Sequence, residues 1–227
     1  MSALPVSIQI IAQVSAAERA GMQTGAEFLS SSMKAVRQGI TQPMKLAFVD
    51  ESADPNVLPM GQVFILSMQT ELARPAEDMD AVMARWMSRL EALKARPGLL
   101  FLCNIFRLAD EPVQPGGSSD LVARIRRLNL IAIQLSHATG VNIIDVDRVL
   151  AYFGQRVFRC DYRLDNPRAA DAVGHAVASA ILSSGPDDII EPVDQEKARQ
   201  ALGDIDSLPR LIRRREEARK RAAQQNG

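Results

Sequence analysis

Short apolar runs alternate with longer amphipathic segments along most of the chain. Five runs are rich in β-branched or aromatic residues and are bounded by turn residues, a pattern typical of β-strands. They lie at residues 7–14, 43–50, 61–68, 98–106 and 141–146. The run at 98–106, GLLFLCNIF, is almost continuously apolar, which indicates a strand covered on both faces.

The segments between these runs have helical periodicity. Val82, Trp86 and Leu90 mark the apolar face of a helix that starts near Asp80 and ends at the RPG stretch of residues 96–98. Similar patterns occupy residues 16–38, 121–140 and 169–182. Parallel neighbouring strands need such crossover connections between them. We therefore expect an α/β fold, a three-layer α/β/α sandwich with a five-stranded parallel sheet.

The composition changes beyond Ile190, where the chain becomes polar, charged and free of aromatic residues. This change predicts an α/β domain at residues 1–188 and a charged helical tail at residues 189–227. Residues 210–221 contain seven arginines or lysines, a local excess that suits an acidic partner. The pairs Glu216–Lys220 and Glu217–Arg221 also have the favourable i,i+4 order of an ordinary solvated helix. We expect a solvated or partner-docking tail.

Composition and charge exclude several classes of protein. The 27 basic residues balance 27 acidic ones, and the tail lacks interleaved aromatic residues, so a nucleic-acid partner is not expected. Cys103 and Cys160 cannot form a disulfide framework, which indicates a reducing compartment. The N-terminal segment lacks the pattern of a signal peptide, and each apolar run is too short for a membrane span. We therefore expect a cytoplasmic protein.

In open parallel sheets, ligands bind at the carboxyl ends of the strands. The polar residues that follow the five runs are Ser15, Asp50, Glu51, Gln69, Thr70, Glu71, Asn104, Arg107, Asp145 and Asp147. No glycine-rich phosphate-binding motif follows the first run. The two histidines, His137 and His175, stand far apart and have no carboxylate or thiolate cluster beside them. We expect neither a cofactor nor a metal ion.

Three stretches resemble SGNH/GDSL-type hydrolases. The stretch RIRRLNLIAIQLSHATGVNIIDVDRVLA at 124–151 is similar to the late region of that family, and GQVFILSMQTE and PGLLFLCNIF are similar to its third and fourth strands. The likeness in order and length covers residues 7–184. It implies a flavodoxin-like sandwich, in agreement with the fold expected from the periodicity.

The same resemblance assigns catalytic positions, with departures from each motif. The family's Gly-Asp-Ser turn corresponds here to Gln13-Val14-Ser15, which makes Ser15 the candidate nucleophile. Its Gly-x-Asn-Asp segment corresponds to residues 68–71, so that Gln69 or Thr70 would donate to an oxyanion. Its Asp-x-x-His pair would use Asp161 or Asp165, but Leu164 or Arg168 then stands where the histidine belongs. Asn104 and Asp145 complete the candidate ligand-binding residues.

Each of these residues also has a structural interpretation. Ser15 is a good N-cap for the first helix, with Glu18 as its capping-box partner. Asp145 and Asp147 are suited to capping the turn at residues 148–152, and Asn104 to satisfying a strand end. Asp161 and Asp165 are suited to holding turns. The helical wheel places His137 and His175 on the solvent side of their helices, away from any role as a base.

Two main hypotheses follow. In the first, the chain is an SGNH-hydrolase-like pseudoenzyme, a non-catalytic binding or accessory component in glycan or polysaccharide metabolism, with a small-molecule or glycan ligand. In the second, it is an active carboxylic ester hydrolase or acyltransferase that uses Ser15 with an atypical base. A proton acceptor within hydrogen-bond reach of Ser15 would favour the second. A third hypothesis is an assembly protein that binds a protein partner through its tail.

Overall fold

The computed structural model describes residues 8–36, 44–54, 57–108, 118–154, 158–184 and 190–225. Within these ranges, five parallel strands form one sheet in the order β2-β1-β3-β4-β5. The strands are β1 (Ile8–Gln13), β2 (Met44–Phe48), β3 (Val63–Ser67), β4 (Leu99–Cys103) and β5 (Asn142–Ile144). All five predicted strands are confirmed, although the predicted starts at residues 7 and 43 lie outside the described ranges. The predicted α/β class with a parallel sheet is also confirmed.

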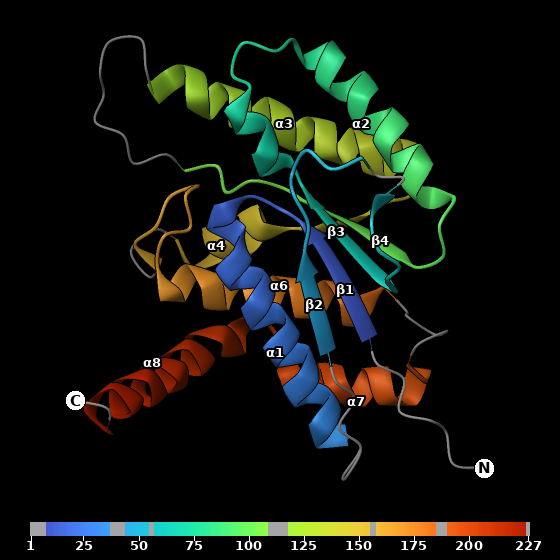
Figure 1. Ribbon diagram of the computed structural model, residues 1–227. Helices are drawn as coiled ribbons and strands as arrows, with labels where there is room; N and C mark the ends of the chain where they lie inside the picture. Colours follow the sequence, from blue (N-terminus) through green and yellow to red (C-terminus); the bar gives the residue numbers. More distant parts are fainter. Residues whose placement is uncertain are drawn as a thin grey trace.

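Helices cover both faces of the sheet (Figure 1). The helices are α1 (Arg19–Val36), α2 (Met79–Lys94), α3 (Ser118–Thr139), α4 (Val146–Phe153), α6 (Pro167–Ser183), α7 (Pro192–Leu202) and α8 (Leu208–Gln225). Short 3₁₀ turns are η1 (Ala16–Glu18), η3 (Met68–Ala73) and η4 (Ile205–Ser207). On β3, Ile65 packs with the α1 and α6 side while Phe64 and Leu66 pack with the α2 and α3 side. This alternation follows from the period of two along a strand.

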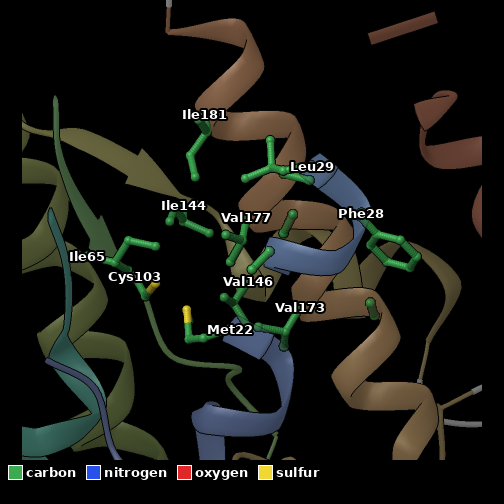
Figure 2. Packing of buried hydrophobic residues seen from close by; sticks show 14 of the residues in the cluster. Met22, Phe28, Leu29, Ile65, Cys103, Ile144, Val146, Val173, Val177 and Ile181 are labelled. Carbon is green, nitrogen blue, oxygen red and sulfur yellow. The ribbon is translucent and has the colours of Figure 1, made fainter. Parts of the chain in front are cut away.

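Among the described residues, α1 and α6 form the most extensive contact between two helices. Figure 2 shows Met22 and Leu29 of α1 beside Val173 and Val177 of α6, with Ile65, Cys103 and Ile144 of the sheet to their left. Glycines lie at the contact on both helices. A Cβ atom at Gly174 would lie only 2.8 Å from the backbone nitrogen of Gly25, so this position has no room for a larger side chain. Small residues therefore set the distance between these two helices.

We expect Gly174→Ala to destabilise the fold despite the better helix propensity of alanine. A Cβ atom this close to backbone places the overpacking cost in the upper part of the usual range, about 2–3 kcal/mol, and the propensity gain offsets about 1 kcal/mol, so the free energy of unfolding should fall by about 1–2 kcal/mol. Urea-induced unfolding measures this difference. Ser31→Ala, an exposed change on α1, is the matched control and should stay within about 0.5 kcal/mol of the parent chain. Equal stability of Gly174→Ala and the parent would contradict the close contact.

The C-terminal helices pack against this layer. Helix α7 contacts both α1 and α6, and α8 contacts α6. Ala198, Leu202, Leu208 and Ile212 are buried in the same core cluster as α1 and α6. The predicted division into residues 1–188 and 189–227 stays a prediction, since its boundary lies outside the described residues.

The helical-wheel prediction for His175 is wrong. His175 is only 3% exposed, because α7 covers the outer face of α6, and its Nε2 atom lies 3.1 Å from the Gly203 carbonyl oxygen. Burial lowers the pKa of His175, which favours the neutral ring. His137 is exposed near the end of α3, as expected.

No helix among the described residues is long and apolar enough to cross a lipid bilayer.

Candidate functional site

Ser15 lies at the carboxyl edge of the sheet, directly after β1. It is the N-cap of η1, the single 3₁₀ turn that leads into α1, and its side chain is partly exposed. Ser67 ends the neighbouring strand β3, which pairs in parallel with β1. Parallel pairing brings the ends of these two strands to the same edge. The N-cap interpretation of Ser15 is confirmed.

Glu18 joins the two serines. Its Oε2 atom accepts a hydrogen bond from the Ser15 hydroxyl at 2.8 Å and another from the Ser15 backbone N–H at 3.0 Å. Its Oε1 atom accepts a hydrogen bond from the Ser67 hydroxyl at 2.5 Å. Ser67 in turn accepts the backbone N–H of Gln69 at 3.0 Å. We call this arrangement the Ser15–Glu18–Ser67 cluster.

The carboxyl group of Glu18 is buried, with 1% of the residue exposed. Desolvation raises its pKa from 4.5 to about 7, although the hydrogen bonds from Ser67 and Ser15 lower it and nearby Glu51 raises it slightly. A buried carboxyl with this pKa exchanges its proton near neutral pH. The cluster therefore places a partly exposed hydroxyl against a group that can accept its proton.

The predicted oxyanion residues lie in η3, beside Ser67. The Gln69 side-chain amide donates to the Tyr162 carbonyl oxygen at 2.8 Å, and the Thr70 hydroxyl donates to the Ser67 carbonyl oxygen at 2.9 Å. The bond from Gln69 also ties this turn to the loop that carries Asp161. The structure therefore brings Gln69 and Thr70 next to the cluster, with both donors bonded to backbone carbonyls.

The loop before α6 holds the two candidate acids. Asp161 is 3% exposed and accepts hydrogen bonds from the backbone N–H, Nε and Nη2 of Arg163 at 2.9, 3.0 and 2.6 Å. Asp165 is exposed. Leu164, one of the two residues expected where the resemblance places a histidine, is buried with a φ of 53°. The carboxylate of Asp161 thus orients an arginine of its own loop.

Asn104 and Asp145 also come together, at the ends of β4 and β5. The Asn104 amide donates to Asp145 at 2.6 Å, and its oxygen accepts the Asp147 backbone N–H at 3.0 Å. Asp145 caps α4 by accepting the backbone N–H of Arg148 at 3.0 Å. Asp147 is paired with Arg107 at 2.6 Å. These contacts agree with the structural interpretation of Asn104, Asp145 and Asp147.

A hollow of about 720 Å³ opens beside the same edge of the sheet. Its wall includes Thr70 and Arg19, the residue that follows Glu18 in the chain. The other charged residues that line it are Asp50, Glu51, Asp54, Glu71, Arg74, Arg85 and Arg89. Arg74, which follows η3, and Arg85 and Arg89 of α2 were not among the candidates, because they do not directly follow a strand. The hollow offers both carboxylates and guanidinium groups to a polar ligand.

Among the described residues, no group of three or more histidine, cysteine, aspartate or glutamate side chains is placed to hold a metal ion.

Comparison with known proteins gives a likeness of fold. No family model matches the sequence, and no curated protein matches it. Among solved structures, the crystal structure of an acetyl xylan esterase, AlAXEase, is similar with a TM-score of 0.54 and 15% sequence identity. The similarity covers 77% of this chain and 100% of that chain. Together with the strand order, it shows that the chain shares the α/β fold of this esterase.

Proposed function

We propose that the chain is an SGNH-type carboxylic ester hydrolase or acyltransferase with Ser15 as nucleophile and Glu18 as general base. The observation that carries this proposal is the 2.8 Å hydrogen bond from the Ser15 hydroxyl to the Glu18 carboxylate. Ser67 orients that carboxylate from its other oxygen. A nucleophile within hydrogen-bond reach of a base that is oriented by a third group is the general signature of nucleophilic catalysis.

The proton transfers follow from this geometry. Glu18 accepts the Ser15 proton as the hydroxyl oxygen attacks the ester carbonyl carbon. The bond to the leaving alcohol then breaks, and Glu18 returns the proton to the leaving oxygen. Water, or a second alcohol in an acyltransferase, then attacks the acyl carbonyl carbon while Glu18 accepts its proton. The bond from that carbon to the Ser15 oxygen breaks, and Glu18 returns the proton to the Ser15 oxygen. A pKa of about 7 suits both directions of transfer near neutral pH.

Gln69 and Thr70 are the proposed donors to the oxyanion. Both lie in the turn that positions Ser67, and both already donate to carbonyl oxygens. When the oxyanion forms, Gln69 or Thr70 would give up its hydrogen bond to a carbonyl oxygen and donate to the negatively charged oxygen instead. The second hydrogen bond is stronger, which favours the transition state. The hollow lined by Thr70 and Arg19 is the proposed place for the rest of the substrate. An esterified glycan is the proposed substrate class, by analogy with the acetyl xylan esterase of similar fold.

A second candidate function is the non-catalytic glycan-binding or accessory protein. The observation in its favour is that Leu164, one of the two residues expected where the resemblance places a histidine, is buried, while Asp161 is bonded to Arg163. In this alternative, Glu18 serves only as the capping-box partner of Ser15. The two functions share the fold and differ in the reactivity of Ser15.

Labelling of Ser15 by a fluorophosphonate probe distinguishes the two functions. We expect the purified chain to hydrolyse p-nitrophenyl acetate and to be modified at Ser15, as located by peptide mass spectrometry. Ser15→Ala should abolish both reactions, whereas Ser183→Ala, an exposed change at the end of α6 outside the wall of the hollow, should preserve both. A folded chain with neither labelling nor hydrolysis would overturn the enzyme and favour the binding protein.

A further inference from the structure

The basic residues of α8 divide into two sets that face different ways. Arg215 and Arg219 face inward and donate to Asp171 of α6 at 2.8 and 2.6 Å. Arg215 also pairs with Glu27 of α1 at 2.9 Å. Asp171 is fully buried. These ion pairs fix α8 against the body of the protein and settle which of its faces points outward.

The outward face is strongly basic. It presents five exposed cationic side chains, which are Arg210, Arg213, Arg214, Lys220 and Arg221. Glu217 is the one acidic residue on this face. We call these five residues the basic stripe. It runs for about 17 Å along the helix. Within the described part of the chain, Arg210, Arg213 and Arg214 form no ion pair. Because the whole chain has no net charge, the stripe is a local concentration of positive charge.

A groove lies beside one end of the basic stripe, between α1, α7 and α8. Its volume is about 500 Å³. Arg210 and Arg214 stand in its wall together with the apolar side chains of Phe28, Leu202 and Leu211. The groove therefore combines two exposed guanidinium groups with an apolar surface.

We propose that the basic stripe and this groove bind an acidic segment of another protein. Its carboxylates pair with Arg210, Arg214 and the following cations, and one of its apolar side chains enters the groove. Guanidinium groups bind carboxylates in bidentate geometry, and a desolvated apolar anchor next to them is typical of a protein-binding hot spot. This inference concerns a surface on the opposite side of the molecule from α2 and α3 (Figure 1) and is independent of catalysis at Ser15.

The surface favours a protein segment over other polyanions. The large exposed apolar residues of the described chain lie outside α8, so the stripe lacks a side chain to insert into a bilayer. Residues 208–225 contain no aromatic residue, so they lack a platform for stacking nucleic-acid bases. The apolar part of the groove has no partner in a phosphate backbone, whereas an aliphatic side chain of a peptide fills it.

Fluorescence anisotropy with a synthetic peptide tests this proposal on the full chain. The probe is a fluorescein-labelled peptide of about 12 residues, composed of glutamates and aspartates around one central leucine. We expect saturable binding at low ionic strength that weakens as salt is added. Arg210→Glu/Arg214→Glu should weaken binding at least about tenfold. Replacing the peptide's leucine by serine should weaken it by about tenfold as well, because the anchor is lost.

The matched control is Arg126→Glu/Arg127→Glu, an equal charge change at two exposed arginines of α3. It should leave the affinity within about twofold of the parent chain. Three results would overturn the proposal: no binding of the peptide, an equal loss in both double variants, or tighter binding of another polyanion. For the last comparison the competitors are a short duplex DNA and vesicles of phosphatidylcholine with phosphatidylglycerol. Because all four positions are exposed, both variants are expected to keep the fold, and circular dichroism checks this.

Discussion

Glu18→Gln is expected to lower kcat/KM for ester cleavage by about 10²- to 10⁴-fold, the range of a lost general base. Glutamine keeps the size of the side chain but cannot accept a proton from Ser15. Initial rates with p-nitrophenyl acetate at several pH values measure the effect. The residual rate of Glu18→Gln should exceed that of Ser15→Ala, which also lacks the nucleophile. Full activity of Glu18→Gln would remove Glu18 from the proposed mechanism.

The pH profile gives a stricter test of the same assignment. Since the carboxylate is the active form, kcat/KM of the parent chain should rise with pH through about 7 and then level. Ser67→Ala removes a hydrogen bond that lowers the pKa of Glu18, so the midpoint of the profile should move to higher pH. A purely capping role for Glu18 predicts no such movement.

Stability should respond to pH in the opposite sense to activity. The pKa of Glu18 is about 7 in the folded chain and near 4.5 when exposed, so the folded state holds the proton more tightly between these values. The contribution of Glu18 to stability is therefore fully present below about pH 4.5 and falls as pH rises through about 7. The loss is on the order of 3 kcal/mol for this group. Urea unfolding at a series of pH values should show a weaker dependence in Glu18→Gln.

Asp171→Ala is expected to reduce the free energy of unfolding by about 3 kcal/mol. The change leaves Arg215 and Arg219 next to each other without the buried carboxylate that both contact. Removing one partner of a buried ion pair typically costs about 3–5 kcal/mol, and partial exposure of the two arginines places this site at the lower end. Urea-induced unfolding followed by circular dichroism measures the difference.

The matched control for Asp171→Ala is Glu196→Ala, which removes an exposed ion pair with Arg199 on α7. Exposed pairs contribute little because both charges stay hydrated, so its unfolding midpoint should match that of the parent. Equal midpoints for Asp171→Ala and the parent would show that the inward arginines do not hold α8 in place.

The strands were predictable because their apolar runs are short, β-branched and clearly bounded. The run GLLFLCNIF predicts a doubly covered strand, and β4 is indeed central enough to pair with both β3 and β5. Helix α4 was predicted only as a turn at residues 148–152, since its eight residues are fewer than a helical pattern needs to be recognised along a sequence. The order of the strands is a property of long-range pairing, which local patterns do not contain.

The candidate site was predictable in its components and not in their roles. The spacing of Ser15 and Glu18 predicts the capping box, but only the fold reveals that β3 brings Ser67 to the other oxygen of Glu18 and that burial shifts its pKa. His175 was misplaced because a helical wheel describes one helix alone, whereas α7 covers the polar side of α6. Tertiary contacts decide both cases.

The close packing of glycines between α1 and α6 also bears on the position of Glu18, the proposed general base. Helix α1 begins at Arg19, immediately after Glu18, and Gly21 lies against Val173 within the first turn. The position of the Glu18 carboxylate therefore depends on how closely the start of α1 packs against α6. A larger side chain at position 21 is therefore expected to shift the start of α1 and to lengthen the hydrogen bond from Ser15 to Glu18, although it contacts neither residue.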